Sequence, residues 1–148
     1  MKSFLFPDVN VWLALSHSRH VHHGIALEWF GSEDDAVFCF CRFTQIGLLR
    51  MLTNTQIMGD EVLTQKRAWD VYSRWAEDDR IEFHREPEGP EFDRLFRRYS
   101  MRAQPSSKLW AHAYLAAFAK AGGLKLATFD RAFKSLDDLQ AIVLPAGK

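Results

Sequence analysis

Two aspartates follow short apolar segments near opposite ends of the chain. Asp8 comes directly after residues 4–7, and Asp130 comes just after residues 124–128. If both segments are parallel strands of one sheet, their carboxyl ends meet at a single edge, where α/β proteins bind ligands. Two carboxylates at that edge could hold a hard cation such as Mg²⁺, which takes one or two carboxylates and keeps several waters. Each aspartate could instead simply cap the short helix that follows it.

Two polar neighbours of these aspartates are candidates for an orienting role. Asn10 follows Asp8 by two residues, and Thr128 precedes Asp130 by two. The amide oxygen of Asn10 could orient Asp8 or a water on the cation, although Asn is also an ordinary residue in the first turn of a helix. If the two aspartates form such a site, Asn10 and Thr128 would orient them.

The elements that must position these residues alternate between strand-like and helix-like patterns. This alternation predicts an α/β fold with a central, mostly parallel sheet of four to five strands. The expected strands are residues 4–6, 37–41, 81–84, 124–128 and 141–144. The expected helices are residues 9–16, 21–32, 43–53, 64–78, 91–99 and 108–121, with a turn-rich break at 54–59. A chain of 148 residues is the size of one domain, so we expect a single domain over residues 1–148.

The net charge of zero hides an uneven distribution. The chain has 19 basic and 19 acidic residues, which argues against a globally basic surface. Residues 94–129, however, contain seven Lys or Arg and no Asp or Glu, which leaves 12 basic and 19 acidic residues elsewhere. We predict that this stretch contacts RNA phosphates, the alternative being a solvated helix face. The candidate contacts are Arg94, Arg97, Arg98 and Arg102.

Other features favour structural interpretations. Cys39 and Cys41 would point to the same face of one strand, so we expect two buried, reduced thiols in a cytoplasmic protein. His17, His20, His22 and His23 do not have the spacing of a standard zinc site, and they predict a surface loop leading into a helix. No apolar run is long enough to span a membrane, so we expect no membrane association.

The aromatic and apolar residues predict a core and an interaction surface. Five tryptophans, at positions 12, 29, 69, 75 and 110, are expected to be mostly in the core. The segment 54–59 places Ile57 and Met58 in a turn. These two side chains are candidates for part of a groove that binds a second copy of the chain or a protein partner.

Four blocks of sequence carry a resemblance to a known family. They are FPDVNVWLAL at residues 6–15, followed by HVHH at 20–23; CRFTQIGLLRMLTN at 41–54; KLWAHAYLAAFA at 108–119; and LATFDRAF at 126–133. In this order and spacing, which span essentially the whole chain, they resemble PIN-domain proteins of the VapC toxin type.

The resemblance implies a PIN-like three-layer α/β/α sandwich and an endoribonuclease dependent on Mg²⁺ or Mn²⁺. It implies the toxin of a type II toxin–antitoxin system, with an RNA substrate, a cognate antitoxin and a homodimeric state. The family's cluster of four acidic residues falls here on Asp8, Gln45, His112 and Asp130. The implied catalytic set is therefore these four residues, with Asp8 and Asp130 as the metal ligands.

Two of those four positions depart from the acidic pattern. Gln45 keeps a carbonyl oxygen but has no charge. His112 offers nitrogen, which suits Mn²⁺ or Zn²⁺ better than Mg²⁺. Three explanations for His112 stay open: a nitrogen-preferring metal, a relative that only binds, or a change selected or introduced to remove toxicity. The alternative function is thus a catalytically inactive PIN-fold module that binds RNA or an antitoxin. A phospho-acceptor receiver domain is disfavoured, because Asp8 has no acidic neighbour.

Overall fold

The computed structural model describes residues 2–136 and 138–145 and contains one central sheet. Its strands are β1 (Ser3–Pro7), β2 (Ala36–Phe40), β3 (Ile81–Phe83), β4 (Lys125–Thr128) and β5 (Ala141–Val143). Their order is β3-β2-β1-β4-β5, and each pair of neighbouring strands is parallel. The five expected strands are therefore present, in a sheet that is parallel throughout the described residues.

Helices connect these strands. The six long ones are α1 (Val9–Ser16), α2 (His23–Ser32), α3 (Arg42–Leu52), α5 (Gln65–Ala76), α6 (Pro90–Ser100) and α7 (Leu109–Gly122). Two 3₁₀ turns are η1 (Gly59–Glu61) and η2 (Arg131–Ser135). The break expected at 54–59 contains a one-turn helix, α4 (Thr55–Met58), because the Asn54 side chain accepts hydrogen bonds from two first-turn amides.

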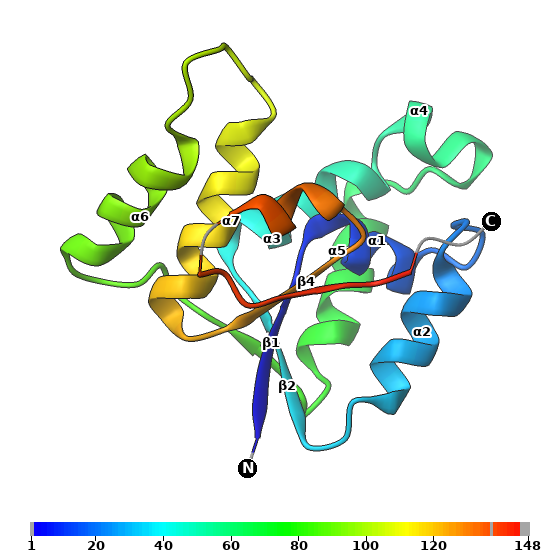
Figure 1. Cartoon of the computed structure of the whole chain (residues 1–148). Coiled ribbons are helices and arrows are strands. Elements are labelled where there is room, and N and C mark those ends of the chain that lie inside the picture. Colours follow the sequence, from blue (N-terminus) through cyan, green and yellow to red (C-terminus); the bar gives the residue numbers. More distant parts are fainter. Residues whose placement is uncertain (1, 137, 146–148) are drawn as a thin grey trace.

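The helices cover both faces of the sheet and make three layers (Figure 1). Side chains of α1, α2, α3 and α5 form a core on one face, whereas α6 and α7 pack against the other face. Adjacent strand residues enter different cores: Leu5 and Phe38 belong to the first, and Phe6 and Cys39 to the second. This period-2 alternation with both faces buried is the reason that these strands are apolar throughout. The predicted α/β/α sandwich is confirmed.

Several buried residues match their sequence interpretation and others do not. Cys39 and Cys41 are buried and free, as expected. Trp12 is fully buried and stacks on Phe40, with 3.9 Å between ring centroids. Met58 is in the core, so its predicted place in a surface groove was wrong. It is the C-terminal residue of α4, and the short helix directs its side chain inward.

Two of the five tryptophans lie outside the core. Trp69 and Trp110 are 50% and 60% exposed, respectively. On α5 only Ala68 is fully buried, so this helix packs through a narrow stripe that excludes Trp69. The first buried residue of α7 is Ala113, and the turn that carries Trp110 therefore projects from the packed body. Among the described residues, the structure has no helix long and apolar enough to cross a membrane.

Candidate active site

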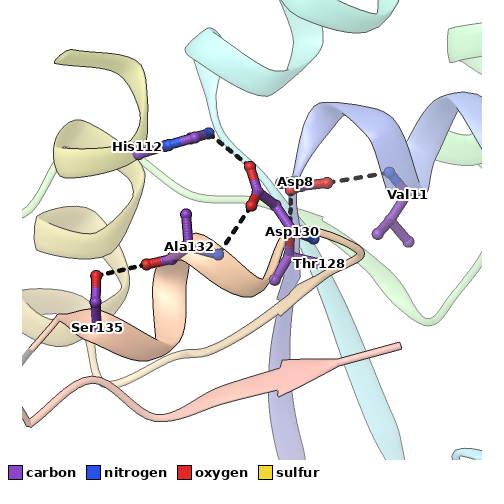
Figure 2. A network of polar contacts seen from close by, with 7 residues as sticks. All are labelled: Asp8, Val11, His112, Thr128, Asp130, Ala132 and Ser135. Carbon is purple, nitrogen blue, oxygen red and sulfur yellow. Dashed lines mark hydrogen bonds and ion pairs between the residues drawn. The ribbon is translucent and has the colours of Figure 1, made fainter. Parts of the chain in front are cut away.

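The order of the chain reverses between the neighbouring strands β1 and β4. From β1 the chain builds β2 and β3 on one side, then returns to place β4 and β5 on the other side. Pro7 is in register with Ala127, and the Asp8 amide donates to the Ala127 carbonyl at 2.9 Å. Asp8 therefore lies beside Thr128 and Asp130 at the carboxyl edge of the sheet (Figure 2). This is the switch point at which parallel sheets bind ligands.

Asp8 is held by two hydrogen bonds and is only 6% exposed. Its Oδ1 accepts from the Val11 amide at 3.1 Å, so Asp8 caps α1. Its Oδ2 accepts from the Thr128 hydroxyl. Burial raises the pKa of Asp8 above its usual value, and the two hydrogen bonds oppose this rise. The capping and site interpretations of Asp8 are thus compatible, because each uses a different oxygen.

Asp130 is arranged in a similar way. Its Oδ1 accepts from the Ala132 amide at 2.9 Å and caps η2, while its own amide donates to the Thr128 hydroxyl at 2.9 Å. Thr128 therefore donates to one aspartate and accepts from the backbone of the other. This double contact is the geometry needed to fix the spacing of the two carboxylates, as proposed for Thr128 from the sequence.

His112 reaches the same place from α7. Its Nε2 lies 3.2 Å from Oδ2 of Asp130, and its ring packs on Phe133 with 4.7 Å between centroids. A positive charge on His112 lowers the pKa of Asp8, while the negative charge of Asp130 raises it. The residue after β1, a residue of α7 and the residue before η2 are therefore brought together, as the family resemblance implied for Asp8, His112 and Asp130.

Gln45 and Asn10 are placed differently from these three. The Gln45 carbonyl oxygen accepts from the Arg42 guanidinium, and its side chain also contacts the Tyr72 hydroxyl. Among the described contacts, none joins Gln45 to Asp8, His112 or Asp130. Asn10 lines the cavity next to Asp8, but no described hydrogen bond connects it to either aspartate. The predicted orienting role of Asn10 thus has no described bond to support it.

A cavity of about 320 Å³ opens beside Asp8 and His112. From α3 and the residue that caps α4 it is lined by Phe43, Gly47, Arg50, Met51 and Asn54, and further lining residues include Asn10 and Ile57. Gly47 is two residues from Gln45, a rotation of about 200° around a helix. Gln45 therefore faces the first core, where it contacts Tyr72, while Gly47 faces the cavity.

Arg50 is a residue of this cavity that the sequence analysis did not single out. Its spacing from Phe43 and Gly47 places all three on one helix face, a pattern that was visible in the sequence. The pattern alone does not show that this face of α3 lies opposite Asp8, which only the tertiary structure reveals. Arg50 adds a positive charge to a wall that faces a buried carboxylate.

The carboxylates of Asp8 and Asp130 fit a cation that takes only some of its ligands from the protein. Over residues 2–136 and 138–145, no group of three or more His, Cys, Asp and Glu side chains is arranged to hold a metal. Asp8 and Asp130 together supply two carboxylates, which suits a Mg²⁺-like ion that completes its shell with water and phosphate oxygens. A bound cation would also offset the cost of the buried Asp8 charge.

The histidines near α2 take structural positions. His23 Nδ1 lies 2.7 Å from the Ala14 carbonyl, and the His22 ring stacks on Phe129 with 4.6 Å between centroids. His17, His20 and His22 precede the first residue of α2, as a loop leading into a helix should. The sequence interpretation of this segment as a loop is therefore confirmed.

The four arginines of the basic stretch do not form one patch. Arg97 and Arg102 line a hollow between α6 and the start of α7. Nη2 of Arg98 lies 3.8 Å from Oδ2 of Asp138, and the Arg98 guanidinium packs over the Tyr99 ring. Arg94 is exposed on α6. The predicted RNA contact thus divides between two faces of α6, and two of the four side chains border a hollow.

Comparisons with known proteins agree with this architecture. The family model described as PIN domain matches residues 5–139. Ribonuclease VapC41 of Mycobacterium tuberculosis is 41% identical over 145 residues, which cover 95% of this chain and 98% of that protein. Ribonuclease VapC38 of the same species is 33% identical over a shorter stretch, 34% of this chain.

Solved structures share the fold at low sequence identity. VapC20 of Mycobacterium tuberculosis, described as a sarcin–ricin loop cleaving toxin, has a TM-score of 0.65 and 14% identity. The alignment covers 95% of this chain and 99% of that one. VapBC2 of Rickettsia felis, bound to a promoter DNA fragment, has a TM-score of 0.66 and 10% identity over 96% and 99% of the two chains. The arrangement of Asp8, Thr128 and Asp130 agrees with the family assignment that these comparisons give. The family match and the 41% identity show that this chain belongs to the PIN-domain family and, within it, to the VapC type.

Proposed function

We propose that this protein is a metal-dependent endoribonuclease and the toxin of a type II toxin–antitoxin system. The observation that carries the proposal is the pairing of Asp8 and Asp130 through Thr128 at the switch point of the sheet. It occurs in a chain that is 41% identical to a ribonuclease over nearly its whole length. The reaction is hydrolysis of an RNA phosphodiester.

Asp8 and Asp130 are the proposed ligands of Mg²⁺ or Mn²⁺. Such a cation, when bound, polarises the phosphate and activates a water for attack. Thr128 keeps the Asp8 carboxylate in one orientation, since its hydroxyl donates to Oδ2. Arg50 in the cavity wall supplies a guanidinium for a phosphate oxygen, a charge-assisted contact. The low exposure of Asp8 keeps water competition small.

His112 is proposed to regulate how strongly Asp130 attracts the cation. Its Nε2 faces Asp130 Oδ2 rather than an open position, which favours a partner of the carboxylate over a nitrogen ligand for the metal. The same observation supports the second candidate, a PIN-fold module that binds RNA or an antitoxin without cleaving. One oxygen of Asp130 lies next to an imidazole, whereas the two described hydrogen bonds of Asp8 come from the Val11 amide and the Thr128 hydroxyl.

Partners and location follow from the type of protein. We propose a cognate antitoxin, because similar folds are found in the VapBC2 complex and in FitAcB of Neisseria gonorrhoeae. We also propose a homodimer, the state that membership of the VapC type suggests. We propose the cytoplasm as the place of action, because Cys39 and Cys41 are buried and form no disulfide with each other.

Cleavage of a single-stranded RNA with and without divalent cation tests the function. The purified protein should cut RNA in millimolar Mg²⁺ or Mn²⁺, and excess EDTA should stop the reaction. Calorimetric titration with each metal discriminates the two candidates. No heat of binding at millimolar metal, together with retained RNA binding, would establish the binding module and exclude the nuclease.

A further inference from the structure

A large hollow of the described surface is lined by none of the residues of the aspartate pair. It has a volume of about 900 Å³ and lies between α6, the connecting segment 101–108 and the first turn of α7. Its apolar lining includes Phe96, Met101 and Trp110. Met101 and Trp110 are 69% and 60% exposed, which is unusual for side chains of this size on a folded surface.

The Trp110 ring is fixed on one side and free on the other. It packs against Phe96, with 6.3 Å between ring centroids and an interplanar angle of 64°. Phe96 in turn contacts Phe92 and Tyr114, which belong to or border the second core. The indole is therefore backed by a firm aromatic cluster while much of its surface remains open, as a stacking platform requires.

A smaller, connecting hollow shares lining residues with both this platform and the aspartate site. This hollow of about 200 Å³ is lined by Arg102, Ser106, Lys108, Leu109 and His112. It shares Arg102, Ser106 and Leu109 with the tryptophan hollow, and His112 with the cavity beside Asp8. Shared lining residues thus link the three hollows in series, from Asp8 past His112 to Trp110.

The charge of these linked hollows suits a polyanion. Arg97 and Arg102 border the tryptophan hollow, and Arg102 and Lys108 border the connecting one. Asp93 is the acidic side chain in the lining of the two hollows. Apart from Asp93, Ala132, Ser135 and Leu136, the lining comes from residues 94–129, a part of the sequence with seven basic residues and no acidic ones. Basic side chains beside an open aromatic ring are the combination that binds single-stranded nucleic acid.

From these observations we infer that an unpaired base of the RNA stacks on Trp110, with Arg97 and Arg102 on the neighbouring phosphates. This inference rests on the proposed function, because it assigns a second contact for the same RNA substrate. Trp110 is a binding residue for a nucleotide some distance along the strand from the cleaved phosphate. The connecting hollow carries the backbone between them. Duplex RNA would bind poorly here, since its bases are not available for stacking.

Binding of a short fluorescent single-stranded RNA, in EDTA so that no cleavage occurs, tests this inference. Trp110→Leu should weaken binding by roughly 5- to 100-fold, as expected when one base loses its stacking partner. Trp110→Phe should retain most of the affinity. Trp69→Leu is the matched control: this tryptophan is similarly exposed but lies on α5, and its change should leave affinity unchanged.

Three results would overturn the inference. They are unchanged affinity of Trp110→Leu, equal losses in Trp110→Leu and Trp69→Leu, or equal binding of single-stranded and duplex RNA by the unmodified protein. In the first case the hollow would be left for a protein partner such as an antitoxin. Circular dichroism confirms folding of each variant. Because binding is measured without metal, failure of the nuclease proposal leaves this test intact, and cleavage by Trp110→Leu with wild-type affinity would refute only the stacking inference.

Discussion

The Nε2 atom of His112, on α7, lies 3.2 Å from Oδ2 of Asp130, the residue that caps η2. Asp130 Oδ1 is already bound to the Ala132 amide, so the histidine contacts the oxygen that would otherwise face the site. An imidazolium at this position competes directly with a divalent cation for the same carboxylate. The pair therefore sets how much negative charge the site offers to a metal.

Replacement of His112 by Asp should increase metal binding and RNA cleavage. A carboxylate in contact with the cation adds attraction on the order of a few kcal/mol at a partly exposed site, so we expect a rise of about tenfold or more in the initial rate. Rates with a single-stranded RNA at fixed Mg²⁺ measure it. His112→Asn, which removes the imidazole without adding charge, is the control. Equal rates for His112→Asp and the unmodified protein would refute a limiting role of His112.

Replacement of Asp8 by Asn should abolish cleavage and increase thermal stability. We expect a loss of about a thousandfold or more, because a bound cation supplies several kcal/mol of transition-state stabilisation. The amide keeps an oxygen for the Val11 hydrogen bond that caps α1. Undiminished cleavage by Asp8→Asn would refute the assigned site.

The stability of the unmodified protein relative to Asp8→Asn should depend on pH. Burial raises the pKa of Asp8, so the folded state binds a proton more tightly than the unfolded state. Ionisation of Asp8 therefore costs stability as pH rises through the raised pKa, and this cost is absent below its unfolded value. Melting temperatures of both proteins in EDTA should diverge as pH rises from acid to neutral, with Asp8→Asn the more stable at pH 7. A constant difference across this range would contradict the prediction.

Replacement of Thr128 by Val should lower cleavage by roughly 10- to 100-fold, the usual effect of losing a group that orients a metal ligand. Valine has nearly the same shape but removes both the donor to Asp8 and the acceptor for the Asp130 amide. Thr128→Ser keeps the hydroxyl and should retain most of the activity. Steady-state rates over a series of Mg²⁺ concentrations check this, and the loss should be partly recovered at high Mg²⁺. If Ser and Val variants are equally impaired, Thr128 acts through packing alone.

Replacement of Gly47 by Ala should destabilise the fold through a steric clash between α3 and α1. An added Cβ would lie 2.5 Å from Cγ2 of Val9, closer than carbon atoms can approach. We expect a loss of about 1–3 kcal/mol in the free energy of unfolding, typical of overpacking. Denaturant titration measures it. The double variant Gly47→Ala with Val9→Ala should be more stable than Gly47→Ala, and a double variant that is no better would exclude Val9 as the cause.

Much of the fold and part of the site followed from sequence alone. The apolar segments and helical periods located the five strands and the six long helices, because burial on both faces demands continuous apolar strands. The convergence of Asp8 and Asp130 also followed, since residues just after neighbouring parallel strands meet at one edge of the sheet.

Only the tertiary structure decided which helix face meets that edge. Spacing shows that Gly47 and Arg50 share a face and that Gln45 lies opposite, but the packing of α3 on α1 determines that Gly47 faces the cavity and Gln45 does not. In the same way, packing buried Met58 and left Trp110 exposed beside Arg102. Local sequence sets the direction of a side chain relative to its own helix axis, whereas the rotation of that helix against its neighbours depends on contacts between distant segments.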